Sequence, residues 1–242
     1  MRNIKTYHQL FESQPELPHK QIKFLDRHVK GTWKINTETG LVDVDGDFQC
    51  NVGVKTTFEE IQFGHVSGNF HFTNLTNHKI TSLIGSPRTV GRSFYCTFNE
   101  ITSLEGSPKI VGGDFNCIGN KLRSLEGSPE EVGGSFYCRT NPLSTLKGAP
   151  KKIGRSFQCD SFDLGYNQWN QEGWIRKARE SERNFKLLIP LLPENYIDEH
   201  ILKNPLDIDL LNPFPEIKSG VLKRTGLRDV SRLASIRRQG LI

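Results

Sequence analysis

The chain has 242 residues and a formal net charge of +5, because 32 lysines and arginines outweigh 27 aspartates and glutamates. This length accommodates one large domain or two small ones. Hydrophobic residues make up only 35% of a chain that also carries 22 glycines and 12 prolines, a composition that suits thin coils better than a compact globule. No run approaches the roughly 18 apolar residues of a membrane span, and the first residues lack the apolar stretch of a secretory signal. We therefore expect a soluble protein that is made and acts inside a cell, without membrane contact.

Residues 1–40 contain no repeat and are interpreted as an N-terminal cap. A first short helix is predicted from four apolar residues that share one helical face, and a second over residues 21–29. The four residues are Ile4, Tyr7, Leu10 and Phe11. Trp33-Lys34-Ile35 indicates a first strand. A repeat array needs such an end piece to cover its outermost unit.

The opening segment Ile4-Lys-Thr-Tyr-His-Gln-Leu-Phe-Glu12 also resembles the capsid-targeting peptides of internal head proteins in T-even-type tailed phages. Those peptides begin with a similar Lys-Thr-Tyr helix and are cut after a Leu/Ile-x-Glu triplet, which Leu10-Phe11-Glu12 matches. The resemblance implies cleavage after residue 12 and packaging in a virion. The alternative is an amphipathic cap in which residues 1–12 are retained, and the sequence leaves both open.

Four consecutive blocks beginning at Ile80, Ile101, Leu122 and Leu143 repeat one 21-residue pattern. A fixed period of this length indicates stacked units that cannot bury their apolar faces alone. The recurring positions are Leu83/104/125/146, Gly85/106/127/148, Pro87/108/129/150, Val90/Val111/Val132/Ile153, Phe94/115/136/157 and Cys96/117/138/159. The same pattern appears in irregular form upstream, in Val44–Cys50 and Val66–Phe72, so we expect about six coils.

The blocks follow the pattern Phe-x-Cys-x-x-Asn-x-Leu, with Ile101 at its last position in the first block and Phe162 at its asparagine position in the last, and this pattern resembles the leucine-rich repeat family. The other half, Leu-x-x-Leu-x-Gly-Ser-Pro-x-x-Val, is similar to the short bacterial and phage subclass with a proline-bearing return. Residues between Phe and Cys should point outward, onto the concave face that the resemblance implies. Within each Val-Gly-Gly-x-Phe-x-Cys segment we expect one strand. We expect Gly85 and its equivalents to take a positive φ, and Asn99, Asn120 and Asn141 to bond backbone groups at the following bend.

These patterns predict a repeat solenoid with one parallel β-sheet, a helical N-terminal cap and an α-helical C-terminal region. The expected domains are the cap at 1–40, the leucine-rich-repeat solenoid at 41–162 and a helical region with a basic tail at 163–242. The five cysteines, Cys50, Cys96, Cys117, Cys138 and Cys159, follow the repeat position and not zinc-ligand spacing. They are therefore interpreted as small buried apolar residues, and we expect no metal and no cofactor.

After Cys159 the pattern changes, because Phe162 stands where asparagine is expected. An aromatic cluster of Tyr166, Trp169 and Trp174 is predicted to cover the last coil. One charged helix is then predicted over 173–188, a second over 194–203, and an apolar connector over 204–214.

The segment 218–242 carries seven basic residues against one aspartate. Arg224, Arg228 and Arg232 would share one helical face, and Arg237 and Arg238 follow. One hypothesis is contact with nucleic acid through these five arginines. The other, which we favour, is pairing with acidic residues of the preceding helices, where Glu180, Glu182, Glu194, Asp198 and Glu199 are available. A solvated helical tail is the further alternative.

No catalytic constellation is evident in the sequence. The seven histidines are scattered, and the Gly-Gly pairs recur with the coil and lack the Lys-Ser/Thr of a phosphate-binding loop. Secreted bacterial ubiquitin ligases join similar repeats to a helical domain with a nucleophilic cysteine, but no cysteine follows Cys159 here. We expect a protein that is not an enzyme.

The predicted concave face is small, polar and nearly neutral, with two tyrosines as its large side chains. Such a surface favours a protein partner over phosphate groups. The expected contact residues are Gln49, His71, Tyr95, Asn116, Tyr137, Arg139 and Gln158. Arg88, Arg92, Lys109, Lys151, Lys152 and Arg155 are expected off the sheet, on the return segments.

The resulting hypothesis is a phage-encoded protein–protein interaction module that binds a host or phage protein in the host cytoplasm. Two alternatives remain open at this point. One is a packaged virion component, either internal to the head or structural, and the other is a nucleic-acid-associated protein acting through the basic tail. The identity of the partner and the oligomeric state do not follow from the sequence.

Overall fold

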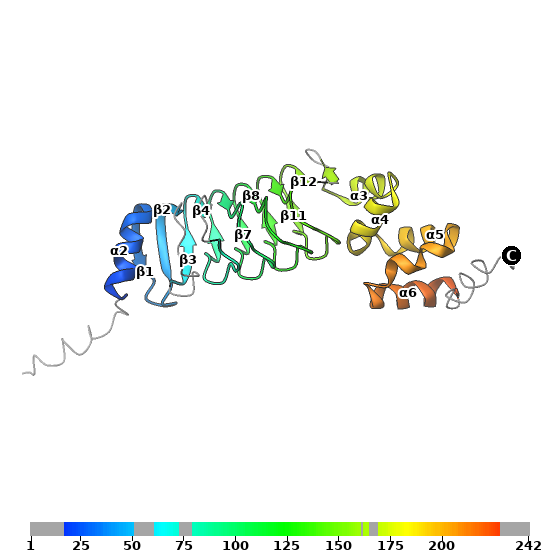
Figure 1. Cartoon of the computed structure of the whole chain (residues 1–242), viewed down its shortest axis with the longest axis horizontal. Coiled ribbons are helices and arrows are strands. Elements are labelled where there is room, and N and C mark those ends of the chain that lie inside the picture. The colour runs from blue at the N-terminus through cyan, green and yellow to red at the C-terminus, as the bar shows by residue number, and fades with distance from the viewer. Residues whose placement is uncertain (1–16, 51–60, 73–78, 161, 165–168, 228–242) are drawn as a thin grey trace, which may run out of the picture. The chain divides into compact units, whose positions relative to one another are not determined.

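A computed structural model describes residues 17–50, 61–72, 79–160, 162–164 and 169–227. It divides into two compact units, of which the first comprises residues 1–143 with 148–166 and the second residues 144–147 with 167–242. The first unit is a β-solenoid, and the second is helical (Figure 1). The helix predicted within residues 1–12 and the arginines beyond 227 lie outside the described residues.

The solenoid is built from two parallel rows of short strands, and each coil contributes one strand to each row (Figure 1). The first row runs through β3 Phe63–Val66, β5 Thr89–Val90, β7 Ile110–Val111, β9 Glu131–Val132 and β11 Lys152–Ile153. The second row runs through β4 Phe70–Phe72, β6 Phe94–Tyr95, β8 Phe115–Asn116, β10 Phe136–Tyr137 and β12 Phe157–Cys159. The long strand β2 Val42–Cys50 starts both rows and joins them into one sheet.

The prediction of one strand per coil was wrong in detail, because each coil bends between its valine and its phenylalanine. In three coils the bend occupies Gly91–Ser93, Gly112–Asp114 and Gly133–Ser135. A side chain at the first bend residue would collide with the coil before it: a Cβ on Gly133 would overlap the carbonyl oxygen of Gly112. The Gly-Gly motif is therefore a close approach between stacked backbones that splits the strand in two.

The phenylalanines of the second row form a continuous column inside the coil. All six are fully buried, the ring centroids of neighbours lie 4.6 to 5.6 Å apart, and adjacent rings are tilted by at most 16°. The column consists of Phe48, Phe70, Phe94, Phe115, Phe136 and Phe157. Burial of each such ring contributes about 1.5–3 kcal/mol to the free energy of unfolding, so this column provides much of the stabilisation of the core.

The other repeated apolar positions also point inward, as predicted. Val44, Val66, Val90, Val111 and Val132 are each at most 2% exposed. The five cysteines are buried and free, and the thiols of Cys96, Cys117 and Cys138 lie 3.3 to 3.5 Å from a carbonyl oxygen of the next coil. Burial raises the pKa of the Cys117 thiol well above its ordinary value, which keeps it protonated and unreactive.

The repeated asparagines bind backbone at the bend after the second row, which confirms their predicted role. The side-chain amide of Asn120 donates to the carbonyls of Cys96 and Cys117 at 3.0 and 2.9 Å, and its oxygen accepts from Ile101 N at 3.1 Å. Asn99 and Asn141 make the equivalent bonds in their own coils. One carboxamide thus ties the beginning and end of its coil to the coil before it.

The glycine before each return has the predicted positive φ, between 83° and 91° at Gly85, Gly106, Gly127 and Gly148. At Gly127 a side chain would in addition collide with the backbone of Glu105 in the previous coil. Glycine is required here both by the left-handed conformation and by the close stacking.

Both ends of the second row are covered by other strands. β1 Val29–Ile35, which includes the predicted strand Trp33–Ile35, pairs antiparallel with β2, and Leu25 of α2 His19–His28 is fully buried at the same end. At the other end β13 Phe162–Leu164 pairs antiparallel with β12. Phe162 therefore begins a capping strand where a further coil would have placed asparagine.

The second unit contains α3 Gln171–Ala178, α4 Glu182–Leu188, η2 Ile189–Leu191, α5 Glu194–Lys203, η3 Pro205–Leu211 and α6 Pro215–Thr225. The single helix predicted over 173–188 is in fact two, because Ser181 caps α4 by accepting from Asn184 N at 3.2 Å. The helix predicted over 194–203 and the apolar connector after it were placed correctly. Phe185, Leu188, Ile201, Leu211 and Val221 form the buried centre of this unit.

We predict that Asn120→Ala lowers the free energy of unfolding by about 3 kcal/mol, because it leaves buried backbone groups without hydrogen-bond partners. Urea unfolding followed by circular dichroism measures this. The control is Asn116→Ala in the same coil, which removes a half-buried side chain bonded locally to Ile118 N and should cost less than about 1 kcal/mol. Equal losses in the two variants would contradict the assigned role of Asn120.

We predict that Cys117→Ala costs about 1–2 kcal/mol through lost packing, and that neither a reductant nor a chelator changes the melting temperature of the wild-type chain. Differential scanning calorimetry measures both effects. A large fall in melting temperature with either reagent would show that the cysteines act through disulfide or metal bonds.

Candidate functional site

Six of the seven residues predicted to contact a partner form one row across six coils. Residue pairing between parallel strands aligns Gln49 with His71, His71 with Tyr95, and Tyr95 with Asn116. The alignment continues through Tyr137 to Gln158. We call these six residues the outer row. Each directly follows a buried phenylalanine in its strand. Because successive side chains of a strand point to opposite faces, these six point away from the core.

The outer row is half-buried along its length, which leaves its side chains accessible but partly held by neighbours. The rings of His71 and Tyr95 lie 5.3 Å apart at an angle of 52°. Burial lowers the pKa of His71, so this side chain is neutral at physiological pH. At the N-terminal end, Lys30 Nζ donates to Gln49 Oε1 at 2.8 Å. The surface presented is therefore aromatic and polar, with little charge.

Arg139 lies beside the outer row and not within it. It follows Tyr137 by two residues, is exposed, and occupies the position that Thr97 and Ile118 hold in earlier coils. The structure thus brings together six of the seven predicted contact residues and places the seventh along the same side of the coil.

One exposed aromatic residue near this row was missed by the sequence reasoning. Phe98 is 55% exposed and has a φ of 56°, a conformation that bulky residues rarely adopt. Its ring lies against Gly119, the equivalent residue of the next coil, which has a φ of 71°. The glycine at that repeat position was the available signal that the backbone there is left-handed.

A second polar row, immediately before the phenylalanines, serves the fold. Asp47 Oδ1 accepts from Asn69 N at 2.6 Å, Ser93 Oγ from Asp114 N at 2.9 Å, and Asp114 Oδ1 from Ser135 N at 2.7 Å. Each side chain binds the backbone of the following coil. These small polar residues therefore hold coils together and are only partly available to a partner.

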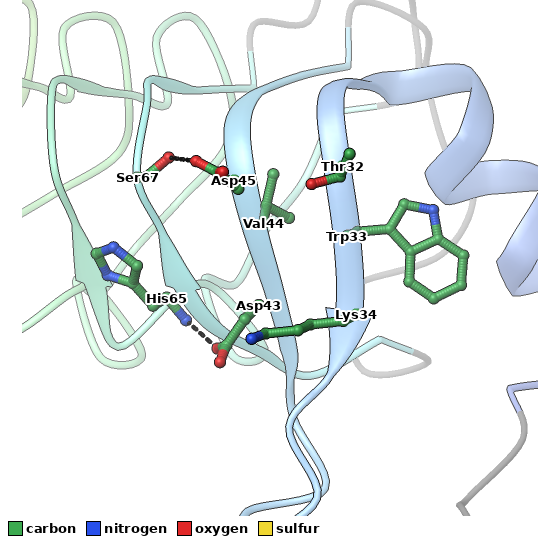
Figure 2. Close-up of a pocket in the computed structure, with 8 residues that line it drawn as sticks. All are labelled: Thr32, Trp33, Lys34, Asp43, Val44, Asp45, His65 and Ser67. Carbon is green, nitrogen blue, oxygen red and sulfur yellow. Dashed lines mark hydrogen bonds between the residues drawn. The ribbon is translucent and has the colours of Figure 1, made fainter.

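A separate hollow of about 400 Å³ lies on β1, β2 and β3 (Figure 2). Its polar lining comes from Thr32, Lys34, Asp43, Asp45, His65 and Ser67. Figure 2 shows the Lys34 side chain extending toward Asp43, while the indole of Trp33 points to the other side of β1.

The serine and the histidine of this hollow bind different partners. Ser67 Oγ donates to Asp45 Oδ1 at 2.9 Å, whereas His65 Nδ1 lies 2.7 Å from Thr89 Oγ1. Asp43 accepts from the backbone N of His65 at 2.8 Å. A serine activated by histidine needs the imidazole within hydrogen-bond reach of its hydroxyl, and Ser67 and His65 here have different partners.

The first arginine of the basic tail pairs with acidic residues of the helical unit. Arg224 Nε and Nη2 donate to the carboxylate of Asp198 at 2.7 and 3.0 Å, and Nη1 lies 3.1 Å from Glu194 Oε2. This is the arrangement that the favoured hypothesis predicted for Arg224. Arg228, Arg232, Arg237 and Arg238 lie outside the described residues.

Of the six basic residues expected on the return segments, Arg88, Lys109 and Lys151 lie there, outside the strands, and the other three are placed differently. Lys152 lies in β11, and Arg92 and Arg155 lie at the bend between the two strand rows. Arg92 and Arg155 were misplaced because the bend between the two strand rows, in which they lie, was not recognised from the sequence.

Within the described parts of the chain, His, Cys, Asp and Glu form no group of three or more suited to hold a metal ion. The helices described there are too short or too polar to cross a membrane. The sequence matches no protein-family model, and comparisons with curated proteins and with solved structures give no significant match.

Proposed function

We propose that this chain is a binding protein without enzymatic activity, which recognises another protein through the outer row. The observation that carries the proposal is the alignment of Gln49, His71, Tyr95, Asn116, Tyr137 and Gln158 on one side of six coils. Their side chains are not needed for the phenylalanine column, the asparagine bonds or the glycine turns. Two tyrosines two coils apart, about 10 Å, supply the large amphipathic groups that interface centres favour.

The repeat motif supports a place among short leucine-rich-repeat proteins of bacteria and phages. Phe-x-Cys-x-x-Asn-x-Leu and the proline-bearing return carry this part of the proposal, together with a β-solenoid of 21-residue spacing. We further propose a phage origin and action in the host cytoplasm, on the resemblance of residues 4–12 and of the repeats. Packaging of the protein in the virion is the alternative that the first twelve residues favour.

We predict that the double variant Tyr95→Ala and Tyr137→Ala loses the partner. Loss of one interface anchor typically costs 2 kcal/mol or more, roughly thirty-fold in affinity, so removal of both should abolish capture. The measurement is affinity capture by the immobilised full chain from bacterial host cells before and after infection, with retained proteins identified by mass spectrometry.

The matched control is Tyr196→Ala, which removes a half-buried tyrosine from α5 in the other unit. It should retain every protein that the wild type captures. Unchanged capture by a double variant with wild-type circular dichroism would place the partner site elsewhere and refute the proposed role of the outer row.

For the basic tail we propose a structural role for Arg224, because its guanidinium already pairs with two carboxylates. Arg224→Ala should lower the melting temperature, whereas Lys223→Ala, an exposed neighbour on the same helix, should not. In fluorescence anisotropy at physiological salt, single-stranded DNA should bind the full chain no better than a chain lacking residues 228–242. Micromolar binding that disappears on this deletion, from a protein that remains folded, would favour the nucleic-acid hypothesis instead.

A further inference from the structure

A shallow groove of about 360 Å³ lies along the bend between the two strand rows. Its floor includes the paired glycines Gly112-Gly113 and Gly133-Gly134, and Arg92 and Arg155 belong to its lining. Because the glycines lack side chains, the groove exposes backbone between two cationic residues. This site is distinct from the outer row and from the hollow of Figure 2.

The two arginines occupy the same repeat position, three coils apart. Gly113 N donates to Arg92 O at 2.7 Å, Gly134 N to Gly113 O at 2.8 Å, and Arg155 N to Gly134 O at 3.0 Å. At the strand spacing of roughly 4.8 Å per coil, the arginine backbones lie about 14 Å apart. The long side chains allow their guanidinium groups to adjust to a ligand of similar length.

Neither guanidinium has an acidic partner within the described residues. Elsewhere on the solenoid, lysines pair with glutamates of the neighbouring coil, as Lys109 and Lys151 do with Glu130 at 3.9 and 2.9 Å. The neighbours of Arg92 and Arg155 at their own repeat position are glycines, so this coil-to-coil pairing is not possible there. Two exposed positive charges are thus left for a ligand at the groove.

The distribution of charge indicates what kind of anion fits. A small anion such as phosphate reaches one arginine but cannot join both across about 14 Å. Asp114 also lines the groove, lies between the two arginines in the sequence, and accepts from Ser135 N at 2.7 Å. Its negative charge would repel a continuous polyanion such as nucleic acid. The ligand should therefore carry two separated negative charges.

An extended peptide meets this requirement. Successive residues of a strand advance about 3.4 Å, and alternate side chains share a face, so carboxylates at positions i and i+4 lie about 14 Å apart on one side. The glycine floor allows a peptide main chain to approach without collision with side chains. We infer that the groove binds an extended acidic segment of a partner protein, with one carboxylate on Arg92 and the other on Arg155.

The test is selection from a random displayed-peptide library on the full chain, followed by fluorescence anisotropy with the recovered peptides. We expect recovered peptides to carry acidic residues separated by three others. Arg92→Gln and Arg155→Gln should each weaken their binding by about ten-fold, the usual effect of losing a charge-assisted bond. The matched control is Arg88→Gln, an exposed arginine of the same coil as Arg92 that lies outside the groove and should bind as the wild type.

The inference is overturned if no acidic peptide is recovered, if both groove variants bind as the wild type, or if Arg88→Gln weakens binding equally. It is also overturned if inorganic phosphate or single-stranded DNA at the concentration of the peptide displaces it, because the site would then be a general anion site. Melting temperatures of the three variants verify that they are folded. Since Tyr95 and Tyr137 lie outside the groove, failure here leaves the proposed function of the outer row untouched.

Discussion

The structure depends on one constraint: every coil must stack on the previous coil at the spacing of hydrogen-bonded strands, with equivalent residues in register. In the second row the backbone N of Phe94, Cys96 and Phe115 each donates to a carbonyl of the next coil at 2.8 or 2.9 Å. At this spacing flat rings can stack, whereas a Cβ at the first bend glycine cannot be accommodated. The 21-residue repeat in the sequence is the consequence, since each position meets its own equivalent above and below.

This constraint also determines which residues are available for binding. The phenylalanines, cysteines and asparagines face the interior, and the polar residues before each phenylalanine bind the backbone of the next coil. Binding is left to positions where the repeat fixes the direction of a side chain but not its identity. The outer row is one such position, and it varies from glutamine to histidine, tyrosine and asparagine. The second bend residue also differs between coils, with Arg92 and Arg155 on either side of Gly113 and Gly134, where an added Cβ would meet the coil before it.

Much of the solenoid could be predicted because its information is local and repeated. One aligned block gives the inward residues, the bonds of Asn99, Asn120 and Asn141, and the positive φ of Gly85 and its equivalents. The split into two strand rows was missed because the close approach of Gly112 and Gly133 is a contact between coils, invisible in the alternation of a single segment. The positions of Arg92 and Arg155 were wrong for the same reason. The break between α3 and α4 was missed because Ser181 was not recognised as a helix cap. The acidic and basic residues on both sides of it suit a single continuous helix equally well. Phe98 escaped notice because its exposure depends on the left-handed corner.

The central claim is that the coils form one cooperative stack held by contacts between neighbours, and amide hydrogen exchange of the full chain tests it most directly. In a stack of this kind the inner coils open only after the coils next to them. The backbone amides of Phe94, Phe115 and Phe136 should therefore exchange slowest, with a common free energy of opening, and those of the end rungs at Phe48 and Phe157 should exchange faster. Unrelated opening energies at Phe94, Phe115 and Phe136, or faster exchange there than at the ends, would contradict the account.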